Sequence, residues 1–382
     1  MNNYISLLPN TFLWVNETEG MLYNTDNFSH YRFDLNADIE LICAALTKLE
    51  NLYTVSLPEN ITGDLQLFID AIIDLKLGFL HQNPQLYTLP PYLKIQEEFQ
   101  EFTFNRNSSC LRNLKEVSVY VGGICDKNQY YIQSDYPISS EDELSYEDID
   151  MIVNHLLPRT ARDIKIILSN VDNYEKINDI FNCLQIDRSR FTICLKPNDY
   201  QHLLSSGFYI PCGINIQLVG FPQDYDILEI DKDIFCQVLI KESIEIELLD
   251  TLTKSICNYS VIPVFDGNNY DFFEQNVYMT KEEICNRKLN KRIIYAHRVI
   301  NLNNFGKISI LPDKKVYSNV LTNPLGSIND NIHLLINEEM LNQKWWFETR
   351  NTAKCTNCLY KYLCPSISIQ ESLMNRKYIC LN

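Results

Sequence analysis

Four cysteines near the C-terminal end of this sequence have a spacing that is typical of metal ligands. Cys355 and Cys358 are separated by two residues, Cys364 follows after five more, and Cys380 lies further along the chain. A C-x2-C pair can bind one metal from a single turn, and two further thiolates can complete a tetrahedral set. Four thiolates suit either zinc or an iron–sulfur cluster. The pattern predicts a metal centre, and the spacing alone leaves both metals open.

The other cysteines are scattered singly. The sequence has 13 cysteines, and most of those outside the cluster, such as Cys194 in Phe-Thr-Ile-Cys-Leu, fall in apolar runs. We expect them to be buried, reduced thiols that pack as small hydrophobic side chains. Reduced single cysteines beside one local cluster favour a metal site over disulfide bonds.

No other pattern of side chains predicts a catalytic site. The six histidines are isolated and lack Cys or carboxylate neighbours at ligand spacing. Gly122-Gly123 has neither the glycine pattern nor the lysine of a phosphate-binding loop. The acidic stretch that ends at Asp150 is better explained by a helix capped by Ser139 or Ser140, because acidic residues stabilise a first turn. We therefore predict no catalytic residue.

Length and charge restrict the class of protein. A chain of 382 residues fits two or three domains. The formal net charge of −16 argues against nucleic acid or an anionic membrane as the partner. No run of about 18 apolar residues occurs, and the N-terminus lacks the features of a signal peptide. We therefore expect a cytoplasmic protein without a membrane span.

Residues 1–83 are predicted to form an α+β unit. Phe12–Val15 and Met21–Tyr23 are β-rich runs joined by a polar, glycine-containing turn, so we expect a hairpin. Apolar spacing then predicts two helices and one extended piece, at residues 39–49, 64–77 and 52–57 respectively. Prolines from Pro84 onward mark a boundary, and residues 84–113 are predicted to be a linker.

Residues 114–294 alternate between strand and helix patterns. Six apolar runs read as strands, and amphipathic helical runs separate several of them. The runs are 116–121, 164–168, 191–195, 214–219, 236–240 and 261–265. Six strands with crossover helices predict an α/β fold with a parallel sheet. This pattern of elements is compatible with either an open sheet or a partial barrel.

Residues 295–382 are predicted to form a third unit, which contains the cysteine cluster. Lys307–Leu311 and Val316–Asn319 flank the turn Pro-Asp-Lys-Lys, so we expect a second hairpin. A helix over 332–343 is expected to lead to Trp345-Trp346 and the four cysteines.

This order of elements and the C-x2-C-x5-C spacing resemble the radical S-adenosylmethionine (SAM) peptide maturases that carry a SPASM domain. The resemblance covers roughly the last two thirds of the chain and implies a partial (β/α)6 barrel of the radical SAM type, followed by a SPASM-like metal-binding domain. The four cysteines fall where the ligands of the family's second auxiliary cluster fall, whereas Asn319 and Ser368 stand where cysteines of the first would lie. The resemblance implies one [4Fe–4S] cluster, with zinc as the alternative.

The family's catalytic motif is absent. Its C-x3-C-x2-C loop should follow the first strand, but that loop contains the single cysteine Cys125, and Ser169-Asn-Val-Asp172 stands where a Gly-Gly-Glu-like loop would contact SAM. This pattern of loss resembles the pseudo-radical-SAM proteins of Bacteroidales systems that mature ribosomally made peptides (RiPPs). It implies a degenerate barrel that binds no SAM.

The first unit resembles the RiPP recognition element, a winged-helix-like module that binds the leader of a precursor peptide. Such modules add the leader as a strand to an exposed sheet edge. The resemblance implies a peptide-binding site with apolar pockets near Leu13, Val15 and Leu22. An unrelated N-terminal cap would have the same order of elements.

Two functions follow as hypotheses. The first is a non-catalytic accessory protein that binds a precursor peptide and partners a true radical SAM maturase or another modifying enzyme. The alternative is an enzyme, either an iron–sulfur redox protein or an atypical peptide-modifying enzyme. The missing cysteine triplet argues against radical generation but is compatible with electron transfer.

Overall fold

The computed structural model describes residues 3–381 apart from residues 62, 83–109, 123–130, 138–142, 160, 170, 185–186, 226–229, 255 and 343. Cys125 and most of the predicted linker lie outside the described residues. No helix in the described part of the chain is long and apolar enough to cross a membrane.

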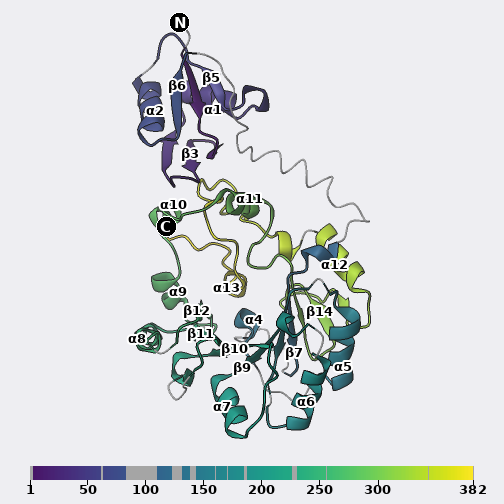
Figure 1. The fold of residues 1–382 in the computed structure, drawn as a ribbon. Coiled ribbons are helices and arrows are strands. Elements are labelled where there is room, and N and C mark those ends of the chain that lie inside the picture. Colours follow the sequence, from purple (N-terminus) through teal and green to yellow (C-terminus); the bar gives the residue numbers. More distant parts are fainter. Residues whose placement is uncertain are drawn as a thin grey trace.

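The N-terminal unit has two small antiparallel sheets and two helices, and it lies at one end of the molecule (Figure 1). One sheet has the order β5-β1-β6 and the other β2-β3-β4. The strands are β1 (Tyr4–Leu7), β2 (Thr11–Val15), β3 (Glu19–Asn24), β4 (His30–Asp34), β5 (Thr54–Ser56) and β6 (Gly78–His81). The predicted hairpin is confirmed as β2–β3, and β4 adds a third strand that the sequence analysis did not predict.

The two predicted helices are confirmed as α1 (Ala37–Leu46) and α2 (Gly63–Asp74). α1 begins where Asn36 accepts a hydrogen bond from the backbone N–H of Ile39, which satisfies one free donor of the first turn. Both helices bury an apolar face in one core that the two sheets share, in which Phe33 and Phe68 meet edge to face at 4.7 Å.

The six predicted strands form a parallel array. They are β7 (Glu116–Tyr120), β8 (Asp163–Ile167), β9 (Phe191–Leu195), β10 (Asn215–Gly220), β11 (Phe235–Ile240) and β12 (Tyr259–Pro263). Their order in the sheet follows their order in the chain, and the β13–β14–β15 extension continues the sheet beyond β7. Within the described residues the sheet has β12 and β15 at its edges.

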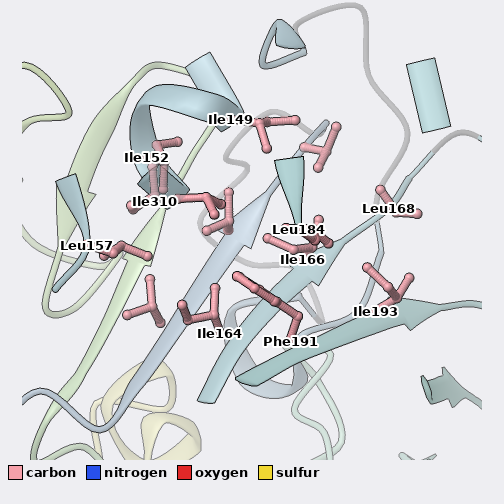
Figure 2. Close-up of a cluster of buried hydrophobic side chains, with 14 of the residues drawn as sticks. Ile149, Ile152, Leu157, Ile164, Ile166, Leu168, Leu184, Phe191, Ile193 and Ile310 are labelled. Carbon is pink, nitrogen blue, oxygen red and sulfur yellow. The ribbon is translucent and has the colours of Figure 1, made fainter. Parts of the chain in front are cut away.

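Helices cover one face of this sheet. The main ones are α6 (Tyr174–Cys183), α7 (Pro197–Ser205), α8 (Ser243–Leu252) and the shorter α5 (Tyr146–Asp150). Figure 2 shows the largest apolar core, in which Ile164 and Ile166 of β8 gather with Ile149 and Ile152. The cap of α5 is Ser145, which accepts from the N–H of Asp148, whereas the predicted caps Ser139 and Ser140 lie outside the described residues.

The C-terminal part joins the sheet and then wraps toward the N-terminal unit. The second predicted hairpin is confirmed as β13 (Lys307–Ile310) and β14 (Lys315–Tyr317), with β15 (Gly326–Ser327) beside it. The remaining α-helices are α4 (Tyr131–Ser134), α9 (Tyr270–Asn276), α10 (Lys281–Cys285), α11 (Lys291–Val299), α12 (Ile332–Asn342) and α13 (Ile369–Leu373). Figure 1 shows α10, α11 and the C-terminus between the N-terminal unit and the central sheet.

The β2–β3 hairpin is buried on both faces. Leu13 and Leu22 face the core of the N-terminal unit. Trp14 and Met21 face the other way and pack in one cluster with Leu359 of the cysteine segment. A fully buried large apolar side chain contributes about 1.5–3 kcal/mol. The N-terminal unit is therefore firmly docked on the segment that carries the cysteines.

Candidate functional sites

The four predicted metal ligands are brought together. Cys355, Cys358, Cys364 and Cys380 all line one cavity of about 30 Å³. Tight turns hold the first two, because the N–H of Cys358 donates to the carbonyl of Cys355 at 3.0 Å. The N–H of Cys364 donates in the same way to Tyr360, also at 3.0 Å.

Cys380 is held by its neighbours in the chain. The N–H of Met279 donates to the carbonyl of Ile379 at 2.8 Å, and the N–H of Leu381 donates back to Met279 at 3.0 Å. These two bonds form a short parallel bridge on either side of Cys380. The fourth thiol is thereby fixed at the cavity although it is far from the others in sequence.

Burial keeps two of these thiols, Cys364 and Cys358, protonated while no metal is bound. It raises the pKa of Cys364 to about 12, against the opposing effect of Arg350, and it raises the pKa of Cys358 as well. The thiolate is the form that binds metal, so a metal must displace these protons. The donor set and its shared cavity fit a four-thiolate centre. Within the described residues, no three His, Cys, Asp or Glu side chains are grouped closely enough to hold a metal ion as they stand.

Positive charge surrounds the cysteine cavity. Lys281, Arg350 and Lys361 line it together with the thiols. Arg350 is fixed by a two-pronged ion pair with Glu371, at 2.8 and 3.0 Å, and by a bond to the carbonyl of Pro365. Four thiolates on one metal centre carry a net negative charge, and these cations are placed to offset it.

Asn319 and Ser368, where the resemblance would place cysteines, take part in hydrogen bonds instead. Asn319 accepts a hydrogen bond from the N–H of Leu321 at 2.8 Å. Ser368 caps α13 by accepting from the N–H of Glu371 at 3.2 Å. Both residues line a second cavity, which is much larger than the first.

The larger cavity, of about 610 Å³, lies against the sheet face opposite the main core. In β7, Ser118 and Tyr120 point into it, whereas Val117 and Val119 pack into the core. Residues from β8, β11, β13 and α13 contribute to the lining, and so do residues from α4, β12 and α9. Ile379 lines both this cavity and the cysteine cavity.

A buried charge network forms one wall of the large cavity. The ammonium group of Lys165 lies 2.8 Å from Asp135 and 3.2 Å from Glu116. Ser118 donates to the other oxygen of Asp135 at 2.8 Å. Burial alone would raise the pKa of Asp135, but Lys165 and Ser118 outweigh it and hold that pKa below its usual value. Burial alone would lower the pKa of Lys165, but the two carboxylates raise it.

The sequence analysis missed this cavity although a signal was present. The strand Glu116-Val-Ser-Val-Tyr120 alternates polar and apolar residues, and Lys165 interrupts the apolar run of β8. A parallel strand buried between two layers should instead be apolar throughout. Polar alternation in such a strand therefore indicates a hydrated face.

The three predicted peptide-binding residues have different exposures. Leu13 and Leu22 are 4% and 0% exposed and lie in the core of the N-terminal unit. Val15, at the end of β2, is 45% exposed. A ligand on the surface could contact Val15, whereas Leu13 and Leu22 lie beneath the sheet.

The outer edge of β4 is the more open edge of this sheet. The N–H of Leu35 donates to the carbonyl of Thr18 at 2.8 Å, and the N–H of Asn24 donates to the carbonyl of Ser29 at 2.9 Å. Because antiparallel bonding alternates along a strand, the backbone groups of Tyr31 and Phe33 between them also face β3. The backbone groups of His30, Arg32 and Asp34 therefore face outward. Among the described residues no strand pairs with this edge, and Arg32 and Asp34 are exposed. The outer edge of β2 is buried from Thr11 to Trp14.

No protein-family model and no curated protein matches this sequence. Among solved structures, Streptococcus suis SuiB bound to the precursor peptide SuiA aligns with a TM-score of 0.45 and 11% identity, covering 99% of this chain and 98% of that one. SuiB bound to S-adenosylmethionine aligns with a TM-score of 0.41 and 12% identity, covering 99% of each chain. SuiB alone gives 0.43 and 12%, covering 99% of this chain and 100% of that one.

Proposed function

We propose that this chain binds a ribosomally made precursor peptide as an added strand on the outer edge of β4 and partners a separate modifying enzyme. The observation that carries the proposal is this open edge, with outward backbone groups at His30, Arg32 and Asp34. Main-chain hydrogen bonds to such an edge supply affinity in strand addition. An uncovered edge in a stable protein otherwise invites aggregation.

Side chains beside the edge would supply selectivity. Leu13, Leu22 and Tyr31 lie in register as one row across the three strands. An added strand would extend this row, so an apolar side chain of the peptide would contact the half-buried Tyr31. The ring of Tyr31 is itself supported from within by Phe68, whose ring centre lies 6.2 Å away. In this proposal Leu13 and Leu22 support the row from within, and Val15 borders it.

The proposal assigns no radical chemistry to the chain. The C-x3-C-x2-C triplet that holds the catalytic cluster of radical SAM enzymes is absent from the sequence, so the partial barrel would serve as a scaffold without SAM. The four cysteines would hold one [4Fe–4S] cluster, with zinc as the alternative. Such a centre would tie the Cys380 region to the cysteine segment on which the N-terminal unit is docked.

The test uses proline at an outward-facing position. In Arg32→Pro, the lost N–H points away from β3, so the sheet is preserved while the new ring blocks an incoming strand. Arg32→Ala is the matched control, because it removes the same side chain and its ion pair with Glu19 but keeps the N–H. A fluorescently labelled precursor peptide encoded next to the gene is titrated against each protein, with a scrambled peptide for comparison.

We expect Arg32→Pro to weaken binding at least tenfold and Arg32→Ala to change it little. Val15→Pro, which blocks the edge of β2, should also have little effect. Equal affinity for wild type and Arg32→Pro would contradict strand addition at β4. Deleting residues 1–80 is a poor test, because it would expose the apolar surface around Leu359.

An iron–sulfur redox protein is the second candidate. It is favoured by one observation, which is that Ile379 separates the cysteine cavity from the large polar cavity and lines both. A redox centre at the cysteines would therefore be adjacent to a ligand in the large cavity. Reversible reduction of the purified protein coupled to a change in the peptide would support this function over the accessory one.

A further inference from the structure

The cysteine segment is bonded to the N-terminal unit through its main chain. The side-chain amide of Asn16, in the turn between β2 and β3, donates to the carbonyl oxygen of Asn357 at 3.1 Å. The indole N–H of Trp14 donates to the carbonyl oxygen of Leu359 at 2.7 Å. These two carbonyl groups belong to the residues immediately before and after Cys358. One of the predicted metal ligands is therefore held between two bonds from the N-terminal unit.

A row of side chains leads from Trp14 to the open edge on β4. Trp14 of β2 is in register with Met21 of β3, and Met21 is in register with Arg32 of β4. The guanidinium of Arg32 forms an ion pair with Glu19 and also interacts electrostatically with the hydroxyl of Tyr360, which lines the cysteine cavity. Both ends of the row therefore contact the cysteine segment. A strand added to β4 would become the next member of this row.

The turn between β2 and β3 makes a second connection from the cysteine segment to β4. The side-chain oxygen of Asn16 accepts from the N–H of Thr18 at 2.9 Å and from the N–H of Glu19 at 2.7 Å. These bonds fix the amide that reaches the cysteine segment. The N–H of Leu35, just after β4, donates to the carbonyl oxygen of Thr18 at 2.8 Å. The end of β4 and the cysteine segment are thus bonded to the same turn.

A bound metal would change the segment that these contacts hold. The four thiols line one cavity, but no three potential ligands among the described residues are grouped closely enough to hold a metal as they stand. A metal must therefore draw the thiols together and fix the backbone between them. Because the N-terminal unit contacts the same backbone, ordering it with a metal lowers the entropic cost of ordering the β4 edge for a ligand. Coupling of this kind acts by the same factor in both directions.

We propose that the four-cysteine centre and the β4 edge are coupled, so that a bound metal strengthens the binding of the precursor peptide. The inference rests on the proposed strand addition at β4 and concerns its regulation. Loss of the metal would then weaken capture of the peptide. The competing explanation is that the contacts only dock the N-terminal unit on the cysteine segment. In that case the peptide would bind equally well with and without metal.

The test compares peptide affinity in metal-free protein with that in protein loaded with one equivalent of Zn²⁺ under anaerobic, reducing conditions. Zinc is the probe because it binds four thiolates and has no redox chemistry of its own. The labelled precursor peptide is titrated against each form. The affinity for Zn²⁺ is measured with and without peptide, by competition with a chelator. The comparison of Arg32→Pro with Arg32→Ala is made in the metal-free form, in which the coupling does not contribute.

The double variant Asn16→Asp/Tyr360→Phe breaks two of the contacts and preserves most of the packing. The first change keeps the oxygen that accepts from the turn but removes the donor to the cysteine segment, and the second removes only a hydroxyl. Asn27→Asp is the matched control. The amide of Asn27 donates to the carbonyl oxygen of Lys76 at 3.2 Å, and its oxygen accepts from the N–H of Ser29. The control therefore loses the same kind of bond within the N-terminal unit.

We expect Zn²⁺ to strengthen peptide binding at least fivefold, because coupled sites typically affect each other by about 5–150-fold. The peptide should strengthen Zn²⁺ binding by the same factor. The double variant should reduce this factor to below about twofold, and Asn27→Asp should keep it. Equal peptide affinity with and without Zn²⁺ would overturn the coupling and leave strand addition standing. The coupling is also overturned if the double variant keeps the full factor, or if wild type binds no Zn²⁺.

Hydrogen exchange with Zn²⁺ alone distinguishes failure of the coupling from failure of strand addition. If the peptide binds neither form, strand addition fails, and the link between metal and β4 is judged without peptide. We expect the amides of Tyr31 and Phe33 to exchange more slowly with Zn²⁺ bound, because an ordered cysteine segment makes local opening of this sheet rarer. The amide of Ile193 in β9 of the central sheet is the reference. Unchanged exchange at Tyr31 and Phe33 would overturn the coupling whether or not the peptide binds.

Discussion

The indole N–H of Trp14 donates to the carbonyl oxygen of Leu359 at 2.7 Å, which links β2 to the segment between Cys358 and Cys364. The Trp14 ring also meets the Tyr362 ring edge to face at 5.5 Å. A residue near the N-terminus therefore supports the backbone that places the cysteine thiols. The N-terminal unit and the cysteine segment form one packed structure.

Trp14→Phe should destabilise the protein by about 1–2 kcal/mol, because the carbonyl of Leu359 loses its donor in a buried site. Trp14→Ala should cost about 3–5 kcal/mol through the cavity it leaves. Melting temperatures in the presence and absence of metal would measure both effects. If Trp14→Ala melted as wild type does, the interface would not contribute to stability.

Metal content should depend on the four clustered cysteines. We expect Cys355→Ala, Cys358→Ala and Cys364→Ala to lose the metal after anaerobic preparation. Cys285→Ala should keep it, because Cys285 is buried in the neighbouring apolar cluster but does not line the cysteine cavity. Elemental analysis and visible absorbance distinguish iron–sulfur from zinc. Unchanged stoichiometry in all three cavity variants would refute the site.

The reconstituted and reduced protein should not cleave SAM. Radical SAM enzymes use three cysteines to hold a cluster in which one iron is left free for SAM. The corresponding loop of this chain has only one cysteine, Cys125, which cannot hold such a cluster. Chromatography for 5′-deoxyadenosine is the measurement. Formation of that product above the level of a protein-free control would show that radical chemistry persists.

Removing the side chain of Lys165 should lower the free energy of unfolding. Lys165→Met leaves Asp135 without its cationic partner and leaves Glu116 paired only with the more exposed Lys307. Breaking a buried ion pair costs about 3–5 kcal/mol. The double variant Lys165→Met/Asp135→Asn should recover part of the loss. Melting temperatures of the single and double variants provide the comparison, and no recovery would mean that the pair is not coupled.

Stability should fall in acid partly through Asp135. The pKa of this carboxyl is lowered in the folded state, so its ionised form stabilises the fold at pH values above the unfolded pKa of about 3.9. That contribution is lost as the pH falls through the folded pKa. Asp135→Asn should therefore be less stable than wild type at pH 7, with the difference shrinking toward pH 3. A constant difference across this range would be inconsistent with the network.

Periodicity and turn chemistry were enough to predict most of the elements. The apolar positions of α1 and α2 and the six strands from β7 to β12 follow directly from spacing. β4 was missed although His30-Tyr-Arg-Phe-Asp34 alternates polar and apolar residues, which is the period of a half-buried strand. The continuous apolar run Phe12-Leu-Trp-Val15 was a sign of a strand buried on both faces.

The sites were less predictable than the elements. C-x2-C-x5-C spacing pointed to the cysteine cavity because three of its four cysteines are local in sequence. The ion pairs Arg350–Glu371 and Lys165–Asp135 join chain segments that come together only in the folded protein. The spacing of these charged residues in the sequence does not indicate that they form pairs.

Amide hydrogen exchange with and without the precursor peptide is the most direct test of strand addition at β4. The account predicts that the outward amides of His30, Arg32 and Asp34 exchange readily in the free protein and become protected on addition of the peptide. The inward amides of Tyr31 and Phe33, already bonded to β3, serve as the internal reference. Protection confined to residues of the large cavity, or no new protection on β4 at saturating peptide, would contradict the account.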